Sequence, residues 1–136
     1  MTTAQSNQTQ ALVTAASAVM RYAYAPYSNY PVGAALLTTD GTVFTGCNVE
    51  NAAYPSGICA ERTALVKAVS EGFRQFEALA VVTRNGGFPC GQCRQMLYEF
   101  APDLRVMIAE PDGRVLHEAR LRDLLPHGFG PAELER

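Results

Sequence analysis

The sequence predicts an α/β fold with three layers, in which helices cover a mixed five-stranded sheet. Apolar and β-branched runs of strand length alternate with segments whose apolar residues recur at helical spacing. In the middle of the chain the order is strand, helix, strand, helix, strand, which favours parallel neighbours. Tight turns near both ends of the chain favour antiparallel hairpins, so we expect both kinds of pairing in one sheet.

The N-terminal part is expected to begin with a helix that packs on the sheet. From about Gln8 to Tyr24 the apolar residues lie at helical spacing, and Pro26 should end the helix. The next segment, residues 24–31, has too much proline for a helix or a central strand. This region contains four tyrosines within nine residues, which suits either a packed connection or the wall of a pocket: Tyr22, Tyr24, Tyr27 and Tyr30.

Two hairpins, one buried strand and further helices are expected in the rest of the chain. Val32–Thr38 and Thr42–Asn48 flank an Asp-Gly pair, which is the strongest short signal for a hairpin. A second Asp-Gly pair, after Pro111, predicts a similar turn near the C-terminus. The remaining predicted elements are strands at Phe76–Thr83, Leu104–Ala109 and Arg114–Leu116, helices at Cys59–Glu71 and Cys90–Phe100, and a short C-terminal helix.

Length and composition indicate a single domain that spans residues 1–136. A chain of 136 residues, 48% of them hydrophobic, can bury a genuine core. No apolar run approaches the roughly 18 residues of a membrane span, so we expect no membrane partner. The N-terminus carries no positive charge before its apolar part, which favours a cytoplasmic protein over a secreted one. A net charge of −2, with scattered Lys and Arg, argues against nucleic-acid binding.

Three of the four cysteines lie where predicted helices begin. Cys59 opens one helix, while Cys90 and Cys93 lie in the first turn of another. The free N–H groups and the positive dipole end at a helix start favour thiolate over thiol. Three thiolates can hold Zn²⁺ tetrahedrally and leave the fourth position open for water. Glu61 could act as an acid/base beside that water only if Cys59 lies at the very end of its helix, because residues two apart do not share a helical face.

Each of these residues also has a simpler interpretation. The Cys-x-x-Cys pair alone fits a redox pair, two buried thiols or half of a structural zinc site, whose fourth ligand could be Cys47, His117 or His127. Cys47 lies in a β-branched run, which is typical of a core residue, and the histidines are typical of the surface. Glu61 could simply favour the helix dipole. Arg62 is either an exposed helical residue or a donor that offsets the charge of three thiolates.

The two cysteine motifs together resemble those of the zinc-dependent nucleoside and nucleobase deaminases. Cys59-Ala60-Glu61 and Pro89-Cys90-Gly91-Gln92-Cys93 fit the signature of that class in its three-cysteine form. The resemblance extends to the small homotetrameric cytidine deaminases and covers nearly the whole chain. The segments that carry it, in that family's order, are 24–28 (YAPYS), 32–36 (VGAAL), 46–54 (GCNVENAAY), 59–64 (CAERTA), 89–95 (PCGQCRQ) and 124–126 (LLP).

This resemblance implies hydrolytic deamination of cytidine and 2′-deoxycytidine in pyrimidine salvage, with one Zn²⁺ per chain. Cys59, Cys90 and Cys93 would hold the zinc, which lowers the pKa of a water molecule towards neutrality. Glu61 would take a proton from this water, pass it to ring N3 and later protonate the departing ammonia. Arg62 would donate to the sulfurs, as its position beside Glu61 also suggests.

The resemblance also implies which residues contact the nucleoside. Asn48 and Glu50 lie on the same side of an extended chain and would bind the ribose 3′-hydroxyl. Tyr30 stands where the family usually has Phe and would border the base, and Ala60 would also contact the substrate. The residues that would reach into a neighbouring subunit's pocket in the homotetramer are Tyr54 and Phe129.

Three other functions remain open from the sequence. A related deaminase could act on another aminated ring, such as a nucleoside antibiotic, although Asn48 and Glu50 favour a plain ribose. A polynucleotide editor is opposed by the acidic charge and by Glu50, which would leave no room for a 3′-phosphate. A structural-zinc interaction module would have four protein ligands and no water on the metal.

Overall fold

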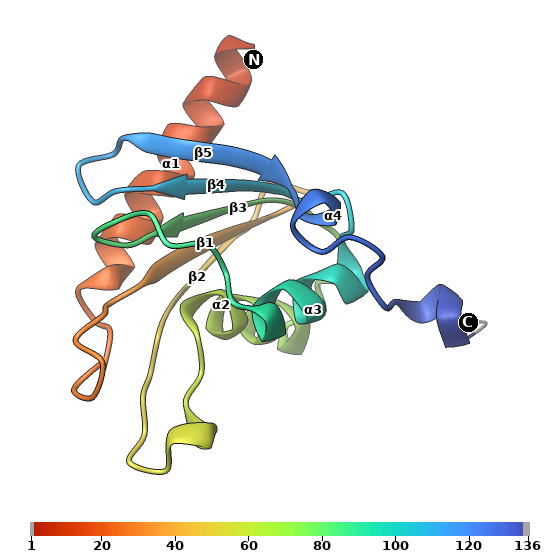
Figure 1. The fold of residues 1–136 in the computed structure, drawn as a ribbon. Coiled ribbons are helices and arrows are strands. Elements are labelled where there is room, and N and C mark those ends of the chain that lie inside the picture. The colour runs from red at the N-terminus through yellow and green to blue at the C-terminus, as the bar shows by residue number, and fades with distance from the viewer. Residues whose placement is uncertain (1, 135–136) are drawn as a thin grey trace.

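Within residues 2–134, which the computed structural model describes, five strands form one mixed sheet (Figure 1). The strands are β1 (Gly33–Thr38), β2 (Val43–Cys47), β3 (Phe76–Val82), β4 (Arg105–Ala109) and β5 (Val115–Arg120). Their order across the sheet is β2-β1-β3-β4-β5. β3 and β4 pair in parallel, and the other pairs are antiparallel. The predicted mixed five-stranded sheet is confirmed.

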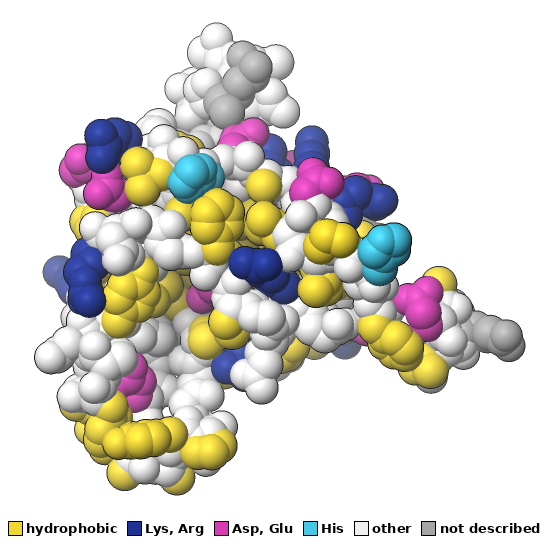
Figure 2. All heavy atoms as spheres, in the orientation of Figure 1, with side chains coloured by type: hydrophobic (Ala, Val, Ile, Leu, Met, Phe, Trp, Pro, Cys, Tyr) yellow, Lys and Arg dark blue, Asp and Glu magenta, His cyan; other side chains and the backbone are white. Residues whose placement is uncertain are grey.

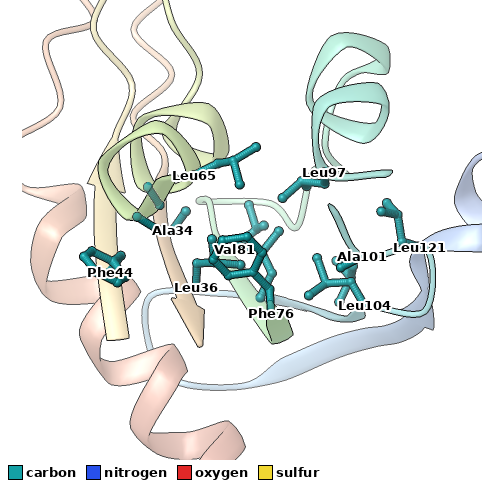
Figure 3. Close-up of a cluster of buried hydrophobic side chains, with 14 of the residues drawn as sticks. Ala34, Leu36, Phe44, Leu65, Phe76, Val81, Leu97, Ala101, Leu104 and Leu121 are labelled. Carbon is teal, nitrogen blue, oxygen red and sulfur yellow. The ribbon is translucent and has the colours of Figure 1, made fainter. Parts of the chain in front are cut away.

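Helices cover both faces of this sheet and produce the three predicted layers (Figure 1). α1 (Thr3–Met20) packs on one face, while α2 (Ala60–Ser70) and α3 (Gly91–Phe100) pack on the other. Figure 3 shows the core on the second face, where Leu65 of α2 and Leu97 of α3 approach Val81 of the sheet. The smaller core under α1 consists of Leu12, Val13, Ala16, Ala35, Leu37, Ala78, Ala80, Val82, Met107 and Ala109.

The central strands are largely buried on both sides, which explains why their sequences are mostly apolar. Every residue of β1 and of β4 is buried, so neither strand shows the alternation expected of a strand with one wet face. Gly33 opens β1 where that strand touches α1, and a Cβ there would lie only 1.9 Å from the carbonyl oxygen of Ala16. Glycine therefore permits the close approach of α1 to the sheet.

The first helix is displaced from its predicted position. It begins five residues earlier than Gln8, because Thr2 and Gln5 form a capping box in which Thr2 Oγ1 accepts from the Gln5 N–H at 3.1 Å. It ends at Met20, four residues before the predicted Tyr24. Tyr24 leaves the helix because its backbone bonds to that of Asn48 and of Glu50, at 3.0 and 2.8 Å.

The other boundaries agree within two residues, apart from the C-terminal end of β5. β5 continues to Arg120 rather than ending at Leu116, because this edge strand is largely exposed and its polar side chains hide it from an apolar pattern. The expected short C-terminal helix is α4 (Leu121–Leu124), and two 3₁₀ turns, η1 (Tyr54–Ser56) and η2 (Pro131–Leu134), complete the elements of the described residues. No helix among these residues is both long and apolar enough to cross a membrane.

Candidate active site

Three segments that are distant in the sequence lie side by side beyond the edge of the sheet. Val49, which follows β2, forms a parallel bridge with Tyr24 and an antiparallel bridge with Ile58. The Val49 N–H donates to the Ile58 carbonyl at 3.0 Å, and the Ile58 N–H donates back at 2.9 Å. The chain that carries Asn48 is thereby placed next to the residue that precedes Cys59. Backbone pairing, rather than any long helix or strand, assembles this part of the site.

The three cysteines predicted as metal ligands converge at the starts of two helices. Cys59 is the N-cap of α2, with an extended backbone (φ −76°, ψ 156°), and Cys90 is the N-cap of α3 (φ −69°, ψ 171°). Cys93 lies in the first turn of α3 and is fully buried. Glu61 can act beside a metal held by Cys59 only if Cys59 lies at the very end of the helix. This condition is met, because Cys59 lies outside the regular helix that carries Glu61.

The spacing of the three sulfurs fits a tetrahedral metal ion. The Cys59 and Cys90 sulfurs are 3.7 Å apart, the Cys90 and Cys93 sulfurs are 3.4 Å apart, and all three lie within 4.8 Å of one another. A tetrahedral zinc with Zn–S bonds of about 2.3 Å requires sulfur–sulfur distances of about 3.8 Å. The thiolate donors and their spacing therefore suit Zn²⁺, and Cys47, His117 and His127 are not part of the group.

Without metal, the three sulfurs share protons unequally. A hydrogen bond from Cys93, and then one from Arg62, lowers the pKa of Cys59 to about 5. The pKa of Cys93 is raised, first because it donates to the Cys59 sulfur and then because it is buried. A metal that binds all three sulfurs as thiolates must therefore displace the proton of Cys93, and its affinity should depend on pH.

Glu61 lies in the first turn of α2 with only 4% of its surface exposed. Burial is the main cause that raises its pKa, to about 7, and the neighbouring Cys59 thiolate raises it further. The pKa of this carboxyl group thus lies near neutral pH, where the group can both accept and donate a proton efficiently. Among the described residues it is the only buried acidic side chain, and it lines a pocket together with Cys59 and Cys90.

Arg62 faces the sulfurs rather than lying free on the helix surface. Its Nη2 lies 3.7 Å from the Cys59 sulfur, and the thiolates of Cys59 and Cys93 raise its pKa. The Nε of Arg62 is buried and has no hydrogen-bond partner. A cation held here would offset part of the negative charge that three thiolates would place on a divalent ion.

A pocket of about 440 Å³ opens beside the sulfurs and the buried carboxyl group. Its volume lies in the range of sites for small organic ligands. Cys59, Glu61 and Cys90 line it together with apolar side chains, two of which are Val32 and Phe88. Of the four tyrosines that could have formed a pocket wall, Tyr30 lines this pocket and Tyr27 a neighbouring one, whereas Tyr22 and Tyr24 are exposed outside both.

Asn48 and Glu50, predicted to bind substrate, both line this pocket, and both also hold the loop that precedes β1. Asn48 is 9% exposed; its Oδ1 accepts from the Val32 N–H at 2.8 Å, and its Nδ2 donates to the Tyr30 carbonyl at 2.9 Å. Each end of this amide retains capacity for one further hydrogen bond, because the oxygen has a second lone pair and the nitrogen a second hydrogen.

The carboxylate of Glu50 is fixed by three donors from one short segment. Its Oε1 accepts from the Tyr27 N–H at 2.9 Å and from the Ser28 N–H at 3.0 Å, and its Oε2 accepts from the Ser28 hydroxyl. The Ser28 hydroxyl, and then the two backbone donors, hold the pKa of Glu50 below its usual value. Glu50 is therefore an ionised acceptor at neutral pH, in a preset orientation.

The structure places the remaining predicted residues in different surroundings. Ala60 is fully buried at the first position of α2, between Cys59 and Glu61. Tyr54, in η1, is 74% exposed, and Phe129, near the C-terminus, is 54% exposed. Neither Tyr54 nor Phe129 lines the pocket that holds Cys59 and Glu61 in the same chain.

Sequence reasoning assigned no role to two residues that support this pocket. Thr83 is buried beyond the end of β3 and accepts from the Gly87 N–H at 2.9 Å. Arg94 donates from Nε to the Pro89 carbonyl and from Nη1 to the Leu124 carbonyl, both at 2.8 Å, so it ties the segment before Cys90 to α4. In the sequence, the position of Arg94 directly after Cys93 was the one feature that could have indicated its role. No feature of the sequence indicated a role for Thr83.

Comparisons with known proteins agree with this site. Residues 6–110 match the family described as the cytidine and deoxycytidylate deaminase zinc-binding region. The chain is 50% identical over 115 residues to a cytidine deaminase of Sporosarcina psychrophila. The aligned region covers 82% of this chain and 84% of that protein. It is 46% identical over 123 residues to one from Halalkalibacterium halodurans, with coverage of 88% and 92%.

A solved structure shows the same agreement in three dimensions. The 1.6 Å crystal structure of a cytidine deaminase from Burkholderia pseudomallei superposes with a TM-score of 0.84 at 48% identity, over 95% of this chain and 100% of that one. The family match contains all three cysteines and Glu61, the residues that meet beside the pocket. The chain therefore belongs to the cytidine and deoxycytidylate deaminase family.

Proposed function

We propose that this chain catalyses the zinc-dependent hydrolysis of cytidine and 2′-deoxycytidine to uridine and 2′-deoxyuridine, with release of ammonia. The observation that carries this proposal is the meeting of three cysteine sulfurs and the buried Glu61 carboxyl group beside one pocket of about 440 Å³. A chemically competent centre and a cavity of nucleoside size thus share the same walls. The names of the relatives above support the choice of cytidine.

The proposed chemistry gives each side chain a defined task. Cys59, Cys90 and Cys93 would hold a zinc ion, which when bound supplies a nucleophile at neutral pH by lowering the pKa of a water molecule. Glu61 takes a proton from the attacking water and delivers it to N3 of the ring, so that C4 becomes electrophilic. It then takes the remaining proton from the oxygen that has bonded to C4 and delivers it to the amino group, so that the C4 carbonyl forms as the C4–N bond breaks and ammonia leaves.

The sugar side of the pocket supports a nucleoside rather than a free base or a polynucleotide. Glu50 presents an ionised carboxylate in a fixed orientation, and Asn48 next to it retains a free donor and a free acceptor site. These groups suit a ribose hydroxyl. A 3′-phosphate would instead meet the negative charge of Glu50.

One assay of metal content and turnover tests this function. The zinc-loaded protein should contain one zinc per chain and convert cytidine with loss of its absorbance and release of ammonia. Because Asn48 and Glu50 are proposed to bind the sugar, kcat/KM for cytidine should exceed that for cytosine by at least about 100-fold. Preference for the free base would remove the role proposed for these two residues. A metal held by four protein ligands, with no turnover, would identify a structural zinc module instead.

We further propose that the working form is a homotetramer, in which Tyr54 and Phe129 of one chain complete the pocket of a neighbour. Both rings are unusually exposed, at 74% and 54%. Figure 2 shows hydrophobic side chains gathered over the loop that carries η1 and on the projecting C-terminal segment. Light scattering should give about four times the chain mass of 14.7 kDa. A fully active monomer would contradict the proposal.

A further inference from the structure

We propose that Tyr30 and Asn85, supported by Arg84, form a clamp that fixes the width of the candidate pocket. Asn85 and Arg84 are then positioning residues, which act on substrate binding through Tyr30. The inference rests on the proposed function, because it concerns the geometry of the same pocket. It uses contacts that the proposed catalytic steps do not need.

The loop at residues 83–89 connects the end of β3 to Cys90 and forms one wall of the pocket. Thr83, Gly87 and Phe88 all line the pocket together with Cys90. Within the described chain, residues 84–88 of this loop make no hydrogen bond from one main-chain group to another. The loop also contains two consecutive glycines, Gly86 and Gly87, whose backbone dihedral angles are weakly restricted. Side-chain contacts must therefore fix its position.

Tyr30 supplies the largest set of these contacts. Its hydroxyl donates to Asn85 Oδ1 at 2.5 Å, and the guanidinium carbon of Arg84 lies 4.8 Å from the centroid of its ring. Arg84 also donates to the Asn29 carbonyl. The hydroxyl packs against Gly87 so closely that a Cβ on Gly87 would lie 2.5 Å from it. The tyrosine side chain is thus held from three directions by one loop.

The backbone of Tyr30 is fastened to the opposite wall. Its carbonyl accepts from Asn48 Nδ2 at 2.9 Å, and its N–H donates to the Ser28 hydroxyl at 3.1 Å. The same Ser28 hydroxyl donates to Glu50. One residue therefore joins the wall proposed to bind the sugar to the loop that leads into Cys90. A change in either contact of the Tyr30 side chain alters the distance between the sugar and the metal centre.

The clamp also defines what the Tyr30 hydroxyl does. Because Asn85 accepts its proton and Gly87 covers it, the hydroxyl is already partnered away from the ligand. The clamp therefore leaves the ring of Tyr30 to border the pocket, as a phenylalanine ring would. The tyrosine hydroxyl thus holds the loop in place. It affects substrate binding only indirectly, through the position of the pocket wall.

A double-mutant cycle on the zinc-loaded protein tests the clamp. Tyr30→Phe and Asn85→Ala should each raise KM for cytidine by about two- to tenfold, the range expected for one net hydrogen bond, with little change in kcat. KM of the double variant should not exceed that of the single variant with the higher KM, because both substitutions remove the same contact. Zinc content should remain one per chain. Tyr22→Phe is the matched control, since Arg21 likewise stacks on and donates to the exposed Tyr22, away from the pocket; its KM should not change.

Hydrogen exchange provides a readout that does not depend on turnover. The Gly87 amide, which donates to Thr83 Oγ1, should exchange faster in Tyr30→Phe, in Asn85→Ala and in Arg84→Ala than in the parent protein, while the amides of β3 stay protected. Additive effects of the two substitutions on KM, or unchanged exchange of the Gly87 amide, would overturn the clamp. So would a large loss in Tyr30→Phe with none in Asn85→Ala, because the hydroxyl would then contact the substrate. Absence of cytidine turnover in the zinc-loaded parent would instead refute the proposed function, and the exchange result would still decide the clamp.

Discussion

Glu61→Gln is expected to lower kcat for cytidine by about 10³-fold or more while leaving one zinc per chain. The amide has nearly the shape of the carboxyl group but cannot accept the proton of water or deliver it to N3. Each proton transfer in the proposed reaction passes through this one group, so its removal affects both halves of the reaction. Single-turnover kinetics together with metal analysis of the same sample would measure the two quantities separately.

The stability of this variant separates catalysis from folding. Glu61 is 4% exposed and its pKa is raised by burial, so the ionised carboxylate is a cost to the folded protein rather than a source of stability. Thermal unfolding of Glu61→Gln should therefore occur at the same or a higher temperature. Glu71→Gln, at the exposed C-cap of the same helix, is the matched control and should keep full activity. If Glu61→Gln stays active, Glu61 is not the proton carrier.

Local signals in the sequence were sufficient to predict most of the fold. The Asp-Gly turns place both hairpins, because Gly41 and Gly113 adopt φ values of 97° and 96° that other residues rarely adopt. The central strands are mostly apolar because both faces of the sheet are covered. Cys59 could be placed at a helix start because the apolar pattern begins at Ala60, and Cys90 because Pro89 precedes it.

Long-range contacts account for what the sequence could not predict. The end of α1 is set by backbone bonds between Tyr24 and residues beyond β2, which no local pattern encodes. Asn48 was predicted to face a ligand, yet its amide also holds the Tyr30 carbonyl. The role of Asn85 depends on a partner 55 residues away. Such residues are ordinary polar side chains in the sequence and gain a function only when two loops meet.

Cys90→Ala is expected to lose zinc and stability together. The remaining two sulfurs, Cys59 and Cys93, come from different helices, and without the third they no longer form the tetrahedral set. When the free zinc concentration is 100 times the Kd, zinc binding raises the free energy of unfolding by about 2.7 kcal/mol. Loss of the metal should therefore lower the free energy of unfolding by about that much or more. Metal analysis and urea unfolding, with and without added zinc, would measure both effects.

Cys47→Ala is the matched control for this prediction. Cys47 lies half-buried in β2, outside the group of three sulfurs, so its removal should leave one zinc per chain and cost about 1 kcal/mol. The comparison also isolates the metal contribution, because a chelator should bring the parent protein close to the stability of Cys90→Ala without changing that variant further. If Cys90→Ala keeps its zinc, or if Cys47→Ala loses it, the assignment of the three ligands is wrong.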